Sequence, residues 1–159
     1  MIALGQILVA TDFSPAADAA LDYARALATR FGATLHVLHA AENLFFRATL
    51  ADPYAIKAAT AKRLEGRLTH YDRDRLGARA IVEVSDDPAD AIVSYARGAR
   101  IGLIIMGTHG REGVAHLLVG SVAERVVRTA PCPVLTIKRR EGDLLLPQLE
   151  TAFTEARAS

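Results

Sequence analysis

The sequence predicts an α/β protein with a mainly parallel, doubly wound sheet. Three observations predict it. A length of 159 residues suits one domain. Short apolar runs of strand length alternate with helical patterns. The junctions between them carry helix-start and helix-end residues. Such alternation of strands and helices implies a parallel sheet covered by helices on both faces.

The first unit is a strand followed by a long helix. Ile7 to Ala10 is a compact apolar run, typical of a buried parallel strand. Ser14 then has the position of an N-cap. The helix runs from Pro15 to Phe31, with apolar residues at helical spacing, and Gly32 ends it. Thr34 to Ala40 is expected to be the second strand.

The middle of the chain repeats this arrangement after a polar, alanine-rich stretch. Pro53 opens a predicted helix whose apolar face continues to about Leu76, and Gly77 closes it. Arg79 to Val84 is the third predicted strand. Asp86-Asp87-Pro88 is a cap followed by proline, and the next helix continues to Ala99.

The last unit differs from the others by a long connection. Leu103 to Met106 is the fourth predicted strand, and the segment Gly107 to Gly120 follows it as a loop. A short helix comes next, at whose start Ser121 and Glu124 have the spacing of a capping box. Pro133 to Ile137 is the fifth predicted strand.

Composition and charge exclude several classes of protein. The net charge of +1 implies no general affinity for polyanions, so no nucleic-acid partner is expected. No apolar run approaches the roughly 18 residues that span a bilayer, and residues 1–7 lack the features of a signal peptide. The one cysteine, Cys132, cannot form an internal disulfide and suits a reducing compartment. The protein is therefore expected to be cytoplasmic, without a membrane partner.

The long loop is the segment most suggestive of function. Strand–helix connections usually take about 2–6 residues, whereas this one holds Gly107, Gly110, Gly113 and Gly120. Glycine-rich backbone can approach a ligand closely and form a nest of N–H groups for an anion, and a helix N-terminus favours phosphate. A purely structural interpretation stays open. The capping box accounts for Ser121 without any ligand, and the first glycines can be turn residues.

Two familiar phosphate-binding motifs do not fit. The pattern GxxxxGK[ST] is missing, because Val122 follows Ser121 and the loop holds no lysine. No GxGxxG follows the first strand, where residues 11–14 read Thr-Asp-Phe-Ser. The sequence therefore disfavours a P-loop NTPase and a standard dinucleotide-binding enzyme.

A family resemblance narrows the ligand. Gly107-Thr108-His109-Gly110, nine residues and then Gly120-Ser121 match the pattern G-x2-G-x9-G-[S/T]. The chain in this respect resembles the ATP-binding branch of the universal stress protein family. The similarity extends over roughly Gln6 to Lys138 and is carried by three blocks in order: residues 7–14, 104–110 and 131–135.

The resemblance implies a five-stranded parallel sheet of order 3-2-1-4-5, as in the adenine nucleotide alpha hydrolase-like fold. It also implies a homodimer, often formed by antiparallel pairing of the fifth strands, here Val134 to Ile137. Residues 1–140 would form the nucleotide-binding domain, and 141–159 a C-terminal tail outside the similarity. Two departures from the family pattern are Gly102 before the fourth strand and Ser85-Asp86 after the third. The second bears on the rim of the cleft.

The family pattern also assigns roles to single residues. Asp12 would accept hydrogen bonds from the ribose hydroxyls or the adenine amino group, although a turn aspartate at the start of a helix needs no ligand. The base would be bordered by Ala10, Thr11 and Ala40. The ribose and base would lie over Met106 and Gly107. The phosphates would meet Thr108, His109 and Gly110 in the loop, and Gly120, Ser121, Val122 and Ala123 at the helix start.

The expected ligand is ATP, with AMP or ADP as alternatives and Mg²⁺ as a further candidate. We assign no catalytic residue and no protein ligand for a metal. The main hypothesis is a nucleotide-binding module in stress response or signalling, and the alternative is a slow ATPase or phosphotransferase. A phosphoacceptor receiver domain is a third hypothesis, because Asp12, Asp86 or Asp87, Thr108 and Lys138 follow strands as receiver residues do.

Overall fold

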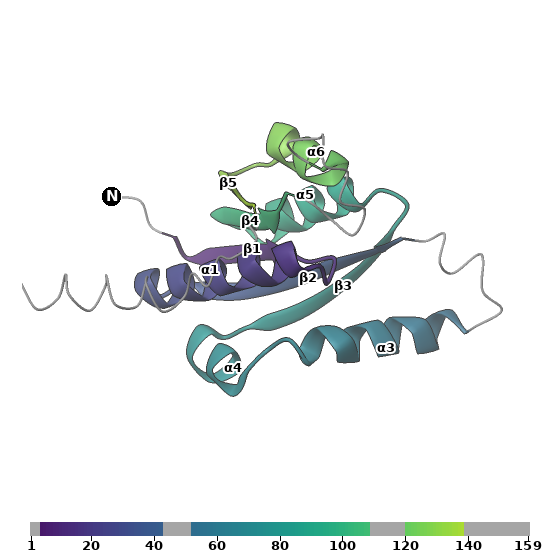
Figure 1. Ribbon diagram of the computed structural model, residues 1–159, viewed down its shortest axis with the longest axis horizontal. Coiled ribbons are helices and arrows are strands. Elements are labelled where there is room, and N and C mark those ends of the chain that lie inside the picture. Colours follow the sequence, from purple (N-terminus) through teal and green to yellow (C-terminus); the bar gives the residue numbers. More distant parts are fainter. Residues whose placement is uncertain (1–3, 43–51, 109–119, 139–159) are drawn as a thin grey trace, which may run out of the picture.

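A computed structural model describes residues 4–42, 52–108 and 120–138 (Figure 1). Its five strands form one parallel sheet in the order β3-β2-β1-β4-β5, which confirms the predicted fold class. The predicted strand bounds differ from the observed ones by two residues or fewer. The strands are β1 (Gln6–Ala10), β2 (Thr34–Glu42), β3 (Arg79–Ser85), β4 (Leu103–Gly107) and β5 (Val134–Ile137).

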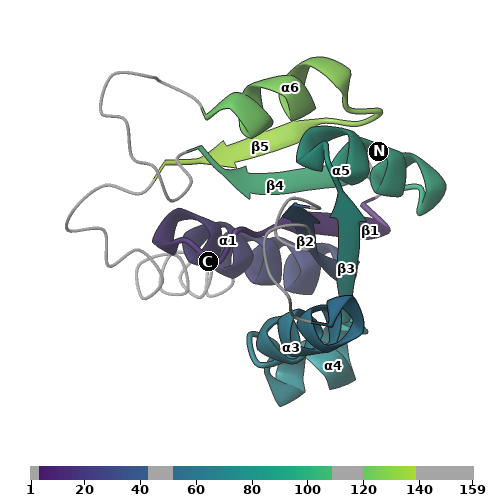
Figure 2. The same ribbon diagram turned by 90° about the vertical axis from the view of Figure 1, so that its right-hand side faces the viewer.

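Helices cover both faces of the sheet. In Figures 1 and 2, α3 and α4 lie at the β3 side of the molecule and α6 lies at the β5 side. No helix among the described residues is long and apolar enough to cross a membrane. The helices are α1 (Pro15–Phe31), α3 (Pro53–Glu65), α4 (His70–Leu76), α5 (Pro88–Gly98) and α6 (Ser121–Thr129).

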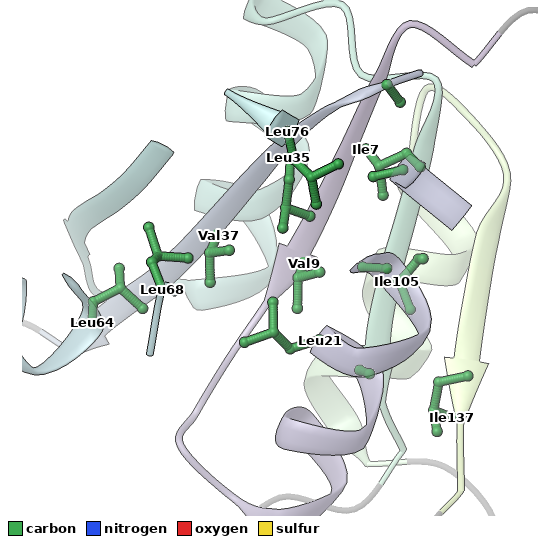
Figure 3. Close-up of a cluster of buried hydrophobic side chains, with 14 of the residues drawn as sticks. Ile7, Val9, Leu21, Leu35, Val37, Leu64, Leu68, Leu76, Ile105 and Ile137 are labelled. Atoms are coloured by element: carbon green, nitrogen blue, oxygen red, sulfur yellow. The ribbon is translucent and has the colours of Figure 1, made fainter. Parts of the chain in front are cut away.

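Alternating side chains of β1 point into two separate cores. Ile7 and Val9 belong to the core under α1, α3 and α4, part of which is drawn in Figure 3. Leu8 and Ala10 belong to the core under α5 and α6. Ile7, Leu8 and Val9 are completely buried. This double burial explains why the strand is a continuous apolar run rather than an alternating one.

The segment predicted as one helix from Pro53 to Leu76 is two helices, so that prediction was wrong. The chain leaves α3 at Gly66, and α4 starts after Thr69, whose side chain accepts a hydrogen bond from the amide of Asp72. The Asp72 carboxylate accepts in return from the amide of Thr69, at 2.8 Å. This capping box stabilises a new helix start and thereby ends the old helix.

The capping box predicted at Ser121 is absent. The N-cap of α6 is Gly120, which has no side chain to cap with, and Ser121 is the first helical residue. The amide of Glu124 donates to the Gly120 carbonyl at 2.9 Å. The serine is therefore one position too far along the helix to act as the cap.

Candidate functional site

The candidate site lies where β1 and β4 end side by side at the middle of the sheet. Ala10 pairs with Met106 at the last step of their ladder. The chain then leaves β1 for α1 on one face, whereas β4 leads towards α6 on the other. In sheets of this type, ligands bind at the switch point, beyond the carboxyl ends of the strands. Of the predicted site residues that the structure describes, Asp12 thus follows β1 and Thr108 follows β4 at the same end of the sheet.

A tight turn carries Asp12 out of β1. The Thr11 amide continues the sheet by donating to the Leu38 carbonyl at 2.9 Å. The Asp12 carboxylate accepts from the Ser14 amide at 2.9 Å, and the Thr11 hydroxyl accepts from the Phe13 amide at 3.0 Å. Asp12 is half-buried. The aspartate therefore has the structural role of a turn residue. Its position at the switch point is also compatible with a contact to a ligand.

Phe13 holds this turn from the inside. Its φ of 63° lies in the left-handed region, which a bulky side chain rarely adopts. The residue is 8% exposed, with the Arg63 guanidinium 4.0 Å from the ring centroid and the His39 ring centroid 4.6 Å away. His39 also contacts the turn directly, because its Nδ1 lies 2.8 Å from the Thr11 carbonyl oxygen.

Gly107 is a glycine because α1 passes directly against it. A Cβ at this position would lie 2.8 Å from the Cβ of Ala16 and 2.9 Å from its carbonyl carbon. Next along the chain, the buried Thr108 donates from its amide to the Ile137 carbonyl at 3.0 Å. The end of β4 is therefore fixed between α1 and β5.

The two ends of the long loop meet at Thr108. The Gly120 amide donates to the Thr108 carbonyl at 2.6 Å, and a Cβ on Gly120 would lie 2.9 Å from the same oxygen. The start of α6 is thus held beside the end of β4. The amides of Ser121, Val122 and Ala123 belong to the first turn, where an α-helix supplies no acceptor for them. They are the donors available to an anion there.

Ala40, predicted to border the base, lies near the end of β2. This strand continues four residues past Leu38, the partner of Ala10, so that Ala40 and Ala41 stand beyond the end of β1. Both alanines are half-buried. The predicted phosphate residues His109 and Gly110 lie outside the described residues, as do Arg111 and Gly113.

An ion pair anchors α6 to α5. Both terminal guanidinium nitrogens of Arg125 donate to Asp87, at 2.9 and 2.7 Å, and Asp87 is also the N-cap of α5. The hydrogen bond from Arg125 lowers the pKa of the Asp87 carboxyl below its ordinary value. In the part of the chain that the structure describes, no group of three His, Cys, Asp or Glu residues could hold a metal ion.

Sequence reasoning missed two residues of this site, Phe13 and His39. Phe13 resembles any turn residue in the sequence, because its positive φ has no residue-type signal. His39 carries no local sequence signal, because its partner Thr11 lies 28 residues away in the chain. Only the pairing of β1 with β2 brings them together.

Comparison with known proteins identifies the family. The model of the universal stress protein family matches residues 4–138, which is most of the chain. The chain belongs to the universal stress protein family. A family member from Thermus aquaticus is 36% identical over 140 residues, covering 83% of this chain and 97% of the relative.

Solved structures agree with the fold. The structure of MJ0577 has a TM-score of 0.72 and 27% identity, and the match covers 89% of this chain and 100% of that one. MJ0577 is a universal stress protein of Methanocaldococcus jannaschii. Two further universal stress protein structures, each 24% identical with a TM-score of 0.62, are complexes, one from Archaeoglobus fulgidus with dAMP and one with cAMP. They match 86% and 87% of this chain, respectively, and 100% of their own chains.

Proposed function

We propose that this protein binds an adenine nucleotide at the shared end of β1 and β4, as a module in stress response or signalling. One observation carries the proposal. The Asp12 turn, the end of β4 and the start of α6 converge at a single switch point, and the last two are joined by the Gly120–Thr108 hydrogen bond. The dAMP and cAMP complexes of two proteins with this fold support an adenine nucleotide as the ligand.

The nucleoside and the phosphates of the ligand contact different parts of the proposed site. Asp12 accepts from the ribose or the adenine amino group, beside Ala10, Thr11 and Ala40. The phosphates take the amides of residues 121–123, at the positive end of the α6 dipole, together with the loop 107–120. ATP is the ligand expected from the loop pattern, with AMP and ADP as shorter forms. Mg²⁺ would arrive with the phosphates of ATP, since this ion usually keeps several waters and few protein ligands.

Strand order argues against the receiver hypothesis. In the receiver type of sheet, the order 2-1-3-4-5 places the third strand beside the first. Here β2 lies between β1 and β3, so Asp12 is two strand spacings, about 10 Å, from the strand that leads to Asp86 and Asp87. Asp87 is in addition paired with Arg125. These carboxylates therefore do not form an acidic cluster with Asp12.

The proposal also covers the assembly, the location and the activity of the protein. The family resemblance favours a homodimer through the fifth strand and a cytoplasmic location. A binding module is preferred over an enzyme, because the observations that carry the proposal concern ligand contacts and none identifies a catalytic base. Sustained hydrolysis of ATP by the purified protein, well above buffer, would instead support the slow ATPase.

Calorimetry with ATP and with AMP tests the binding. We expect Gly120→Ala to weaken ATP affinity about ten-fold, because a Cβ 2.9 Å from the Thr108 oxygen pushes the start of α6 away from β4. Gly98→Ala is the matched control, since a Cβ there meets nothing within 4 Å. It is expected to leave affinity unchanged.

Two results would contradict the proposal. Wild-type protein that takes up neither nucleotide at millimolar concentration would refute nucleotide binding. Equal affinity of the Gly120 variant and wild type would remove the start of α6 from the site.

A further inference from the structure

We infer that His39 is a positioning residue of the nucleotide site: its imidazole fixes the turn that presents Asp12. The inference rests on the proposed function and extends it to a residue that does not itself contact the ligand. It starts from a contact that is not part of the regular sheet. The ladder between β1 and β2 ends with the Thr11 amide, and the Thr11 carbonyl then meets a side chain, His39 Nδ1, at 2.8 Å.

The chemistry of this contact determines which nitrogen of the His39 imidazole carries the proton. A carbonyl oxygen only accepts hydrogen bonds, so the proton of the pair must be on Nδ1. Thr11 is 9% exposed, and a buried carbonyl that loses its partner is costly. The His39 contact therefore determines where the Thr11 carbonyl points, and with it the direction in which the chain leaves β1.

The next two residues need such support. Phe13 is held at a φ of 63°, a conformation that persists only where its surroundings enforce it. The His39 ring lies 4.6 Å from the Phe13 ring, tilted by 42°, and Arg63 covers the ring at 4.0 Å. His39 thus contacts the turn twice, once through the Thr11 carbonyl and once through the Phe13 ring. Asp12 lies between these two contacts.

Two substitutions separate the hydrogen bond from the bulk of the ring. The amide nitrogen of Asn is attached at the position of Nδ1, whereas that of Gln lies at the position of Nε2. His39→Asn therefore keeps a donor for the Thr11 carbonyl, and His39→Gln moves it away. His70→Gln is the control, because His70 is exposed on α4.

Nucleotide affinity is the readout, measured by calorimetry at a temperature where circular dichroism shows every variant folded. We expect His39→Gln to weaken AMP binding about ten-fold and His39→Asn to stay within about three-fold of wild type. The loss should be the same factor for AMP and ATP, because Asp12 serves the nucleoside and the extra phosphates lie elsewhere. Amide NMR signals of Asp12, Phe13 and Ser14 should shift in the Gln variant and remain near wild type in the Asn variant.

The outcomes distinguish this inference from the proposed function. If wild type and both His39 variants bind AMP equally, His39 has no positioning role and the proposed function stands. If Asn and Gln weaken binding equally, the hydrogen bond is not the cause and the inference fails. If wild type binds no adenine nucleotide at all, the proposed function fails and this inference fails with it.

Discussion

Single glycines at this site have structural reasons that a motif cannot reveal. At Gly107 a methyl group would overlap the backbone of α1 at Ala16, and at Gly120 it would overlap the Thr108 carbonyl. The loop pattern favoured room for a ligand at both glycines and left a turn role open for Gly107. The structure shows that both make room for protein, in contacts between segments far apart in sequence. The same close contacts hold the start of α1, the end of β4 and the start of α6 together, where the nucleotide site is proposed.

The close contact between α1 and Gly107 predicts that a side chain at this position lowers stability. Gly107→Ala is expected to lower the free energy of unfolding by about 1–3 kcal/mol, because the backbone of α1 cannot move aside as a flexible side chain would. Urea denaturation measures it. Gly98→Ala, in open space at the end of α5, should instead stabilise by about 0.5–1 kcal/mol. Unchanged stability of the Gly107 variant would mean that α1 is not held against β4 as described.

At the scale of elements, one buried carboxylate joins α4 to α1. Asp72 is completely buried and accepts three hydrogen bonds from Arg25 of α1, between 2.8 and 3.1 Å. Burial alone would raise the pKa of Asp72, but the hydrogen bonds from Arg25 and Thr69 bring the pKa below its ordinary value. This contact explains why the predicted helix breaks. The apolar spacing from Leu64 to Leu68 continues across Gly66 and therefore suggested one helix. The carboxylate that caps α4 is held by Arg25, 47 residues away, which a local pattern does not reveal. The capping-box spacing of Thr69 and Asp72 was the local signal for the break.

The lowered pKa of Asp72 predicts a loss of stability in acid. A carboxylate whose pKa is lower in the folded state stabilises fully above its unfolded pKa, about 3.9, and this is lost as the pH falls through the folded value. Asp72→Asn is expected to cost about 2 kcal/mol near pH 7, below the usual cost of breaking a buried ion pair, because Arg25 keeps Asp22 and the Arg67 carbonyl.

Urea denaturation from pH 7 down to pH 2 measures the effect. The difference between wild type and Asp72→Asn should be constant above about pH 5 and shrink below about pH 4. Asp74→Asn, exposed on the same helix, should show neither effect. A difference that persists undiminished at pH 2 would exclude Asp72 as the titrating group.

For the whole molecule, sequence patterns predicted the architecture because burial on both faces makes the central strands β1 and β4 visible apolar runs. Leu103 to Met106 is one such run, between two helices. The strand order is a different matter. Alternation alone allows β3 at the sheet edge or beside β1, and the family resemblance decided it before the structure confirmed it. The proposed site depends on that order, since Asp12 comes two residues after Ala10, and Ala10 meets Met106 only because β4 pairs with β1.

The last strand carries the prediction for assembly. The carbonyls of Pro133 and Ile137 accept from the amides of Ile104 and Thr108, each at 3.0 Å. The alternation of a parallel ladder therefore turns the amides of Val134 and Thr136 towards the sheet edge. Leu135 is 37% exposed. An edge of this kind can pair with a second copy of itself. The proposed homodimer would use these outward amides.

Thr136→Pro removes one of the two outward amides and leaves the hydrogen bonds between β5 and β4 in place. We expect light scattering to give twice the protomer mass for wild type and a single protomer mass for Thr136→Pro, since proline lacks the donor and is tolerated on an edge strand. Thr136→Val keeps the amide and the β-branched shape, so it should remain dimeric. Circular dichroism must show all three proteins folded.

A wild-type monomer would refute the dimer, whereas a dimeric proline variant would show that the interface is not at β5. The second result would leave the nucleotide site unaffected, because Gly107 and Thr108 are held by α1 and by the inner side of β5 rather than by its edge.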